Sequence, residues 1–156
     1  MISIDRVSFG YGEAQETLSQ VSASITPGEC VLLCGASGCG KSMTLKCIAG
    51  IQRPDWGRIV LGDRVLFDSE AGISLPPQKR RVGYLFQQYA LFPWLTVKKN
   101  VMFALEMKGV KGKAAEEQAM KYLEKVDLVK FADHFPKELS GGMKQRVAIA
   151  RALACN

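Results

Sequence analysis

The sequence is poor in the side chains from which proteins build metal sites. It contains one histidine, His134, and its five cysteines (Cys30, Cys34, Cys39, Cys47 and Cys155) include no CxxC pair. Structural zinc sites need closely spaced cysteines and histidines, so this pattern argues against zinc binding. We interpret the cysteines as reduced thiols of an intracellular protein.

Long apolar runs are also missing. No stretch approaches the roughly 20 apolar residues of a membrane-spanning helix. The first residues, MISIDRV, alternate like a β-strand instead of forming a basic and then apolar signal region. We therefore expect no signal peptide and no transmembrane segment, so any association with a membrane would come through a partner.

The chain does have enough apolar residues for a core. Its 156 residues are 47% hydrophobic, which fits a single folded domain, residues 1–156. Lysine and arginine number 21 against 15 for aspartate and glutamate, a formal net charge of +6. Such a charge is compatible with phosphate ligands, nucleic acid or an anionic membrane, and it does not choose among them.

The strongest motif is GASGCGKS, residues 35–42, which fits the pattern GxxxxGK[ST]. It lies between an apolar run that we expect to be a buried strand, residues 30–34, and a helical stretch, residues 41–49. Glycines let the backbone curl until several N–H groups converge on a polyphosphate, and the helix N-terminus adds a partial positive charge. The predicted phosphate-binding residues are Gly35, Ala36, Ser37, Gly38, Cys39, Gly40, Lys41, for the β- and γ-phosphates, and Ser42, for Mg²⁺.

The other patterns predict an α/β fold. Strands are expected at 2–9, 21–25, 59–61, 65–67 and 82–86, and the last delivers Gln87 to an apolar and aromatic loop, residues 88–95. Helices are expected from Thr96, as N-cap, to about residue 107, over 114–126 and over 144–154. The domain is thus divided into a P-loop core with a β region (1–95), a helical subdomain (96–135) and a final loop and helix (136–156). A basic cluster, residues 78–81, is assigned to a solvated face.

Two other segments have alternative interpretations. Tyr11 lies in a predicted loop, where its ring either stacks on a purine or packs internally. Ser140 and Gly142 precede the final helix and form a second potential anion site at a helix N-terminus.

Four segments together resemble, in order and spacing, the nucleotide-binding subunit of ABC transporters. They are Tyr11, GASGCGKS at 35–42, FQQYALFP at 86–93 and LSGGMKQRVAIARAL at 139–153. The last is the most specific, because a P-loop occurs in many NTPases whereas LSGG followed by QRVAIARAL is typical of this family. The resemblance spans almost the whole chain and implies a P-loop NTPase fold of the ABC type.

The resemblance also implies roles for individual residues. Tyr11 is similar to the A-loop aromatic that stacks on adenine, and Gln87 to the Q-loop residue that reaches Mg²⁺ and the attacking water. Met43 stands where the family usually has a threonine that contacts the α-phosphate. The signature residues, which would clamp the γ-phosphate of ATP held by a second subunit, are Ser140, Gly141, Gly142 and Met143, the last in place of the commoner glutamine.

ATP and Mg²⁺ are the cofactors that this resemblance implies, with Ser42 and Gln87 as metal ligands. The stretch ISLPPQKRRVGYLFQQYALFP, residues 73–93, is similar to the ATPases of oxyanion importers, most closely those for molybdate. Such a subunit would form a head-to-tail dimer at the cytoplasmic face of the cell membrane. Its partners would be a transmembrane permease and, indirectly, a substrate-binding protein, with no nucleic acid.

One part of the family pattern does not occur in these 156 residues. The family follows the signature helix with an apolar strand ending in Asp-Glu, a D-loop and a switch histidine, whereas His134 precedes the signature. We therefore expect an ATPase truncated before Walker B and catalytically incompetent alone. The alternatives are a non-transport ABC ATPase, disfavoured because there is no inserted coiled coil and no second cassette, a small P-loop kinase, and an ATP-binding remnant without hydrolysis.

Overall fold

The computed structural model describes residues 1–11 and 16–155. Its elements in chain order are β1 (Ile2–Gly10), β2 (Glu16–Ile25), α1 (Lys41–Ala49), β3 (Trp56–Leu61), β4 (Arg64–Asp68), β5 (Ile73–Ser74), α2 (Pro77–Arg80), α3 (Val97–Met107), α4 (Gly112–Lys125), two 3₁₀ turns (Val129–Phe131 and Pro136–Glu138) and α5 (Gly141–Cys155). The chain divides into two compact units, Met1–Val82 and Gly83–Asn156. This boundary lies earlier than the predicted end of the β region at residue 95.

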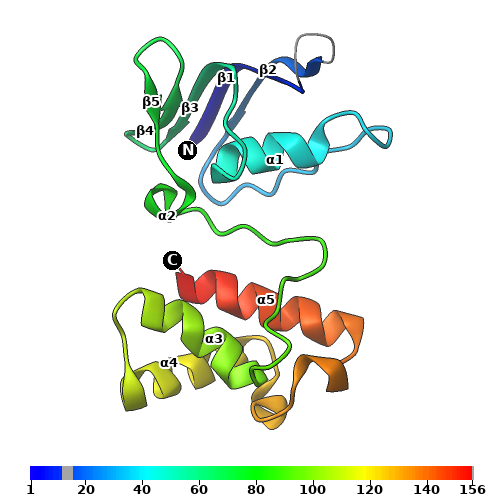
Figure 1. The fold of residues 1–156 in the computed structure, drawn as a ribbon, viewed down its shortest axis with the longest axis vertical. Helices are drawn as coiled ribbons and strands as arrows, with labels where there is room; N and C mark the ends of the chain where they lie inside the picture. The colour runs from blue at the N-terminus through cyan, green and yellow to red at the C-terminus, as the bar shows by residue number, and fades with distance from the viewer. Residues whose placement is uncertain (12–15, 156) are drawn as a thin grey trace. The chain divides into compact units, whose positions relative to one another are not determined.

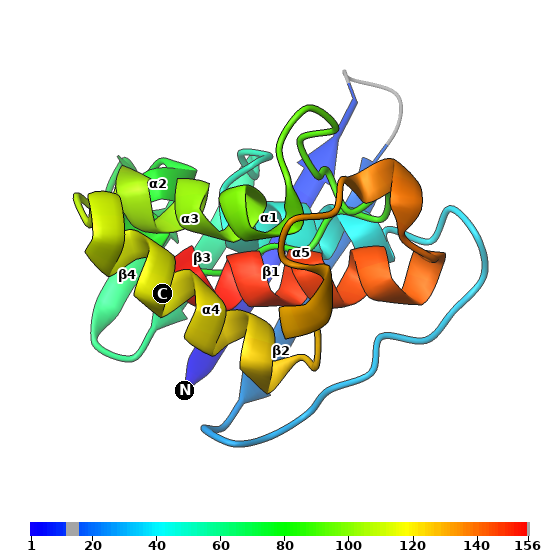
Figure 2. The ribbon, with the colours of Figure 1, turned by 90° about the horizontal axis from the view of Figure 1, so that it is seen from below.

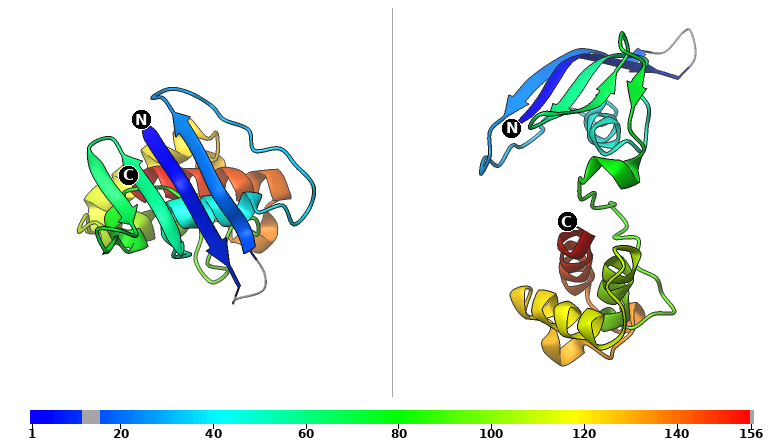
Figure 3. Two further views of the ribbon diagram at one scale, coloured as in Figure 1. Left: turned by 90° about the horizontal axis from the view of Figure 1, so that it is seen from above. Right: turned by 90° about the vertical axis from the view of Figure 1, so that its left-hand side faces the viewer.

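The first unit is an antiparallel sheet with α1 against one face. The strand order is β2-β1-β3-β4-β5, and Figure 3 shows β1 between β2 and β3. Alternating side chains of the strands and one side of α1 meet in a common core, as the alternation in the sequence predicts. That core contains Ile4, Val7, Phe9, Leu18, Met43, Cys47, Ile48, Ile59, Leu66 and Phe67.

A bulge in β1 brings two strands into close contact. The register against β3 shifts between Asp5 and Ser8, and Arg6 has a left-handed φ of 46°. Opposite the bulge, a Cβ on Gly57 would lie 2.6 Å from the carbonyl oxygens of Asp5 and Arg6. Gly57 itself has φ 105°, so only glycine fits this position without strain.

The second unit is a helical bundle in which α5 packs against α3 and α4 (Figures 1 and 2). Thr96 is the N-cap of α3 as predicted, because its hydroxyl oxygen accepts a hydrogen bond from the backbone N–H of Lys99 at 3.3 Å. Ala115, Ala119 and Leu123 form the buried face of α4, as their spacing predicts. The signature helix α5 begins at Gly141, three residues earlier than expected.

Several predicted boundaries are confirmed. Helix α1 has the predicted ends, and Gly50 closes it with a φ of 77°. The hairpin predicted around residues 62–64 is the β3–β4 pair.

Two predicted strands are wrong. Residues 30–34 and 82–86 form no strand, and Leu32 is 83% exposed. A strand needs a neighbour for its backbone hydrogen bonds, and within residues 1–11 and 16–155 neither segment has one. Val31 and Leu33 instead line an open apolar hollow of about 270 Å³ beside α1 and the sheet.

The assignment of the whole basic cluster 78–81 to a solvated face is also wrong. Gln78, Lys79 and Arg81 are exposed, but Arg80 is 1% exposed. Its guanidinium donates hydrogen bonds to the carbonyl oxygens of Leu75, Cys47 and Ile48. The last two belong to the final turn of α1, so Arg80 neutralises the partial negative charge at the end of this helix.

Two further observations concern the cysteines and the helices. All five cysteines fall within the described residues and are free, and Cys47 is the buried one. No helix in the described part of the chain has the length and apolar character to cross a membrane.

Candidate functional site

The phosphate loop in the first unit is organised around the Lys41 ammonium. Its Nζ donates hydrogen bonds to the carbonyl oxygens of Gly35, at 2.8 Å, and Ala36, at 2.5 Å, and lies 3.4 Å from the Sγ of Cys39. The loop therefore curls around its own lysine. The positive charge is held at the loop by carbonyl oxygens, with no carboxylate pairing it among the described ion pairs.

Gly40 is required where the loop enters α1. It is buried, has φ 87°, and a Cβ there would lie 2.5 Å from Cδ2 of Leu18 and 2.8 Å from the carbonyl oxygen of Thr17. A larger residue would displace β2 or the loop. The glycine spacing that the sequence suggested for a phosphate grip thus also has a packing reason.

The N-terminus of α1 is open to an anion. Its N-cap, Gly40, has no side chain to bond the first-turn N–H groups, and the first turn carries no acidic residue. Unpaired N–H groups and the helix dipole favour a phosphate at such an end. Ser42 is exposed there. Met43 is only 7% exposed and its side chain packs in the sheet core, so it offers a ligand only its backbone N–H.

Tyr11 lies at the end of β1 with a largely exposed ring. The residue is 60% exposed, and its ring meets that of Phe9 edge to face, with centroids 5.0 Å apart. Part of the side chain is therefore held by packing while more than half of the residue is open to solvent. The contact with Phe9 agrees with internal packing, and stacking on a purine stays a prediction.

Gln87 and the signature residues lie in the second unit. Gln87 is exposed in a turn closed by a hydrogen bond from the N–H of Tyr89 to the carbonyl oxygen of Phe86, at 2.8 Å. Ser140 is the N-cap of α5, because its Oγ accepts a hydrogen bond from the N–H of Met143 at 3.3 Å. Gly141 and Gly142 have open space where a Cβ would stand, whereas Met143 packs against the helical core.

Sequence reasoning missed a residue that shapes the aromatic loop. Asn100 is fully buried on α3, accepts a hydrogen bond from the N–H of Phe92, and donates to the carbonyl oxygens of Phe92, Leu95 and Thr96. The available signal was an amide on the apolar face of a helix, between Val97 and Ala104. The ring of Phe92 contacts the rings of Trp94 and Phe103, and Trp94 is 70% exposed.

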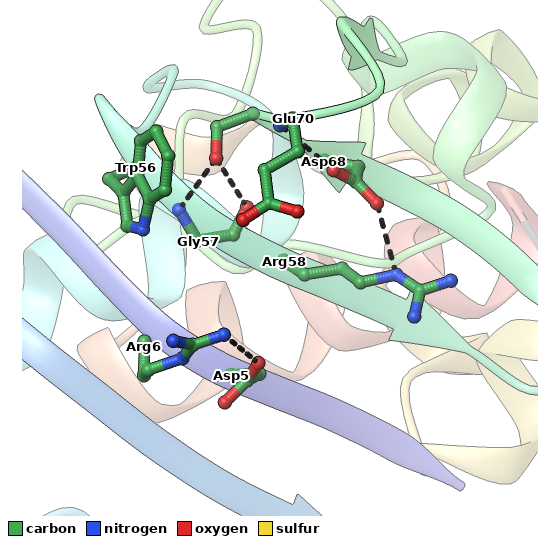
Figure 4. A pocket seen from close by; sticks show the side chains of 8 residues that line it. Asp5, Arg6, Trp56, Gly57, Arg58, Asp68 and Glu70 are labelled. Atoms are coloured by element: carbon green, nitrogen blue, oxygen red, sulfur yellow. Dashed lines mark hydrogen bonds and ion pairs between the residues drawn. The ribbon is translucent and has the colours of Figure 1, made fainter.

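A second hollow on the first unit has different chemistry. Figure 4 shows Asp5, Arg6, Trp56, Arg58, Asp68 and Glu70 around a space of about 190 Å³ next to the β1 bulge. Two ion pairs, Arg6–Asp5 at 3.4 Å and Arg58–Asp68 at 3.2 Å, neutralise most of its charge. The phosphate loop, which holds a cation without a carboxylate beside it, is the stronger candidate for an anionic ligand.

A glycine loop that curls around a lysine at the N-terminus of a helix defines a P-loop NTPase. The family model that matches residues 18–156 is described as ABC transporter. With an antiparallel sheet region and a helical unit that begins its last helix at LSGG, the chain belongs to the ABC transporter family of ATP-binding domains.

Individual relatives agree with this assignment. The chain is 48% identical over 142 residues, 91% of its length, to the spermidine/putrescine import ATP-binding protein PotA of Frankia alni. It is 47% identical over 138 residues, 86% of its length, to the molybdenum import ATP-binding protein ModC of Mycobacterium tuberculosis. It spans 29% and 37% of those two proteins.

A solved structure has the same fold. The ATP-binding cassette MJ0796, in a dimeric post-hydrolysis state bound to ADP and Pi, superposes with a TM-score of 0.84 at 34% identity. The match covers all of this chain and 70% of that one.

Proposed function

We propose that the chain is the nucleotide-binding part of an ABC importer and that it binds Mg-ATP at residues 35–42. The observation that carries this proposal is the Lys41 ammonium held over the phosphate loop at the open N-terminus of α1. Tyr11 stacks on the adenine, and Ser42 and Gln87 take part in Mg²⁺ binding. The bound metal supplies charge neutralisation for the phosphates.

Calorimetry with Mg-ATP tests the site directly. Charge-assisted hydrogen bonds are each worth roughly 1.5–3 kcal/mol, so Lys41→Ala should weaken binding about tenfold to a hundredfold. Lys46→Ala is the matched control, because Lys46 lies in the last turn of the same helix. Equal affinities for Lys41→Ala and Lys46→Ala would contradict the assignment.

ATP-dependent closure of a head-to-tail dimer is the second part of the proposal. Ser140, Gly141 and Gly142 would close over the γ-phosphate of ATP in a second copy, and Gln87 would orient the attacking water. The dimeric MJ0796 cassette supports this assembly. Light scattering should show Mg-ATP-dependent dimers that Gly142→Asp abolishes. The same variant should keep its unfolding midpoint, since nothing lies within 4 Å of a Cβ at this position. Dimers that form equally well in Gly142→Asp would exclude the signature from the interface.

The aromatic surface formed by Phe92, Trp94 and Phe103 is proposed to contact a transmembrane permease. The exposure of Trp94 and Phe103 favours an interface, and such a contact would hold the subunit peripherally at the cytoplasmic face of the membrane. Trp94→Cys, with the exposed cysteines replaced, should cross-link to the permease. Met107→Cys, at a residue 74% exposed near the end of α3, is the matched control. Equal cross-linking from both positions would argue against docking at the aromatic surface.

The transported substrate is proposed to be an oxyanion, molybdate in particular. The resemblance to the molybdenum import protein supports this choice, and the polyamine import protein, at similar identity, names the competing substrate class. Uptake of molybdate and of spermidine by cells that carry or lack the gene would decide between them. Loss of neither uptake would exclude both substrates and leave other imported substrates, such as nitrate, to be tested.

A further inference from the structure

The turn that carries Gln87 contains an unusual backbone. Tyr89 and Ala90 are consecutive residues with left-handed φ angles of 61° and 45°. A residue with a Cβ is strained in this region, and two in succession are rarer than one. Something in the surrounding structure must therefore compensate for the strain.

Arg151 supplies that compensation from helix α5. Its Nη2 donates a hydrogen bond to the carbonyl oxygen of Tyr89 at 3.0 Å, and its Nη1 donates one to that of Ala90 at 2.7 Å. The guanidinium also lies over the ring of Phe92, 5.5 Å from its centroid. Figure 1 shows the green segment of this turn running past the orange and red α5. Burial lowers the pKa of Arg151, yet the carbonyl oxygens still face a cation.

The chemistry of this contact is specific to arginine. A guanidinium presents parallel N–H groups in a rigid plane, so that one side chain reaches two adjacent carbonyl oxygens at once. The ammonium of lysine is a point donor and cannot hold both in the same way. The signal in the sequence was an arginine among alanines and leucine, ARAL, in the second half of a helix whose buried residues are Val147, Ala148, Ala150 and Ala154.

We propose that Arg151 is a positioning residue that holds the strained turn after Gln87 in place. The guanidinium of Arg151 thus connects α5 to both the backbone that follows Gln87 and the ring of Phe92. Helix α5 itself begins at the signature residues. Holding this turn would also hold Gln87 in position for catalysis, and that effect rests on the proposed function. Support of the turn does not, because it follows from contacts within the second unit alone.

A glycine rescue separates this role from ordinary packing. Arg151→Lys should make chymotrypsin cleave the native protein about tenfold faster after Phe86 or Tyr89, because about one of the two charge-assisted bonds is lost. Ala90→Gly, which removes the strain at one of the two left-handed positions, should return cleavage in the double variant to within about twofold of the wild type.

Arg146→Lys is the matched control. Arg146 lies on the same helix and also donates to carbonyl oxygens, those of Val126 and Asp127, the latter itself left-handed with φ 55°. Ala90→Gly should leave the cleavage pattern of Arg146→Lys unchanged. Unchanged cleavage in Arg151→Lys, failure of the rescue, or an equal rescue of Arg146→Lys would overturn the proposal.

Two further measurements complete the test. If Arg151→Lys does not give folded protein, the single variant Ala90→Gly decides, since its thermal midpoint should equal or exceed that of the wild type, and a lower midpoint refutes strain at Ala90. Lys41→Ala should cleave like the wild type within the turn. If the wild type does not bind ATP but Ala90→Gly still rescues Arg151→Lys, the proposed function is refuted and the role of Arg151 stands.

Discussion

Arg80 offers the sharpest test of how the phosphate-loop helix is held. The change is Arg80→Met, which keeps an apolar stem of similar length and removes the guanidinium. Its Nε lies 2.7 Å from the carbonyl oxygen of Leu75, and its Nη1 lies 2.7 Å and 3.0 Å from those of Cys47 and Ile48. Each hydrogen bond to a charged group contributes about 1.5–3 kcal/mol, and each buried acceptor left unpaired costs about 1–3 kcal/mol.

The guanidinium is itself costly to bury, which is why burial lowers the pKa of Arg80. Removing it recovers part of that cost, so we expect a net loss of about 2–4 kcal/mol in the free energy of unfolding. Arg80→Lys, which puts an ammonium in place of the planar guanidinium, should lose about 1–2 kcal/mol in the free energy of unfolding.

Urea unfolding followed by circular dichroism measures both losses, with an unchanged denaturant slope if the unfolded state is unaffected. Lys79→Met is the control, because that neighbouring side chain is exposed, and it should stay within about 0.5 kcal/mol of the wild type. An Arg80→Met variant as stable as Lys79→Met would refute the capping role.

Three further changes have definite expected outcomes. Burial raises the pKa of the Cys47 thiol from 9.0 to about 11, so the folded state binds this proton more tightly than the unfolded state. The protonated thiol therefore contributes stability that is complete below pH 9 and is lost as the pH rises toward 11. Relative to Cys47→Ala, urea unfolding of the wild type should thus show stability falling by up to about 1.4 kcal/mol per pH unit in that window, and a parallel pH dependence would count against this. Asn100→Ala should lower the free energy of unfolding by about 2–4 kcal/mol, since it leaves buried carbonyl oxygens unpaired, and a loss below about 0.5 kcal/mol in urea would mean that water replaces the amide. Tyr11→Ala should weaken ATP binding less than Lys41→Ala in calorimetry, because stacking adds only about 1 kcal/mol beyond area, and the reverse order would refute the ranking of the two contacts.

Local signals predicted the parts of the fold that are decided locally. The ends of α1 follow from the lysine after the glycine loop and from Gly50, and the N-cap of α3 follows from Thr96. The glycine loop was identified because its glycines and lysine must serve the same backbone geometry wherever the motif folds.

The errors concern contacts between distant segments. Residues 30–34 have the composition of a buried strand, but composition does not state whether a pairing strand is present. Arg80 stands among exposed basic residues in the sequence, and its burial depends on the carbonyl oxygens of a helix more than 30 residues away. The roles of Asn100 and Arg151 likewise depend on the loop whose carbonyl oxygens they bind. The periodicity of the sequence does not reveal such contacts.

The open segment 30–34 has a practical consequence for anyone purifying this chain. Val31, Leu32 and Leu33 present three adjacent apolar side chains to solvent, and within the part of the chain that the structure describes their backbone pairs with no strand. Such a segment recruits the same segment of another molecule, because β-pairing satisfies its N–H and C=O groups. Turbidity of concentrated samples should therefore rise with protein concentration, and Leu32→Lys should keep them clear because a charge at the most exposed position opposes stacking between molecules.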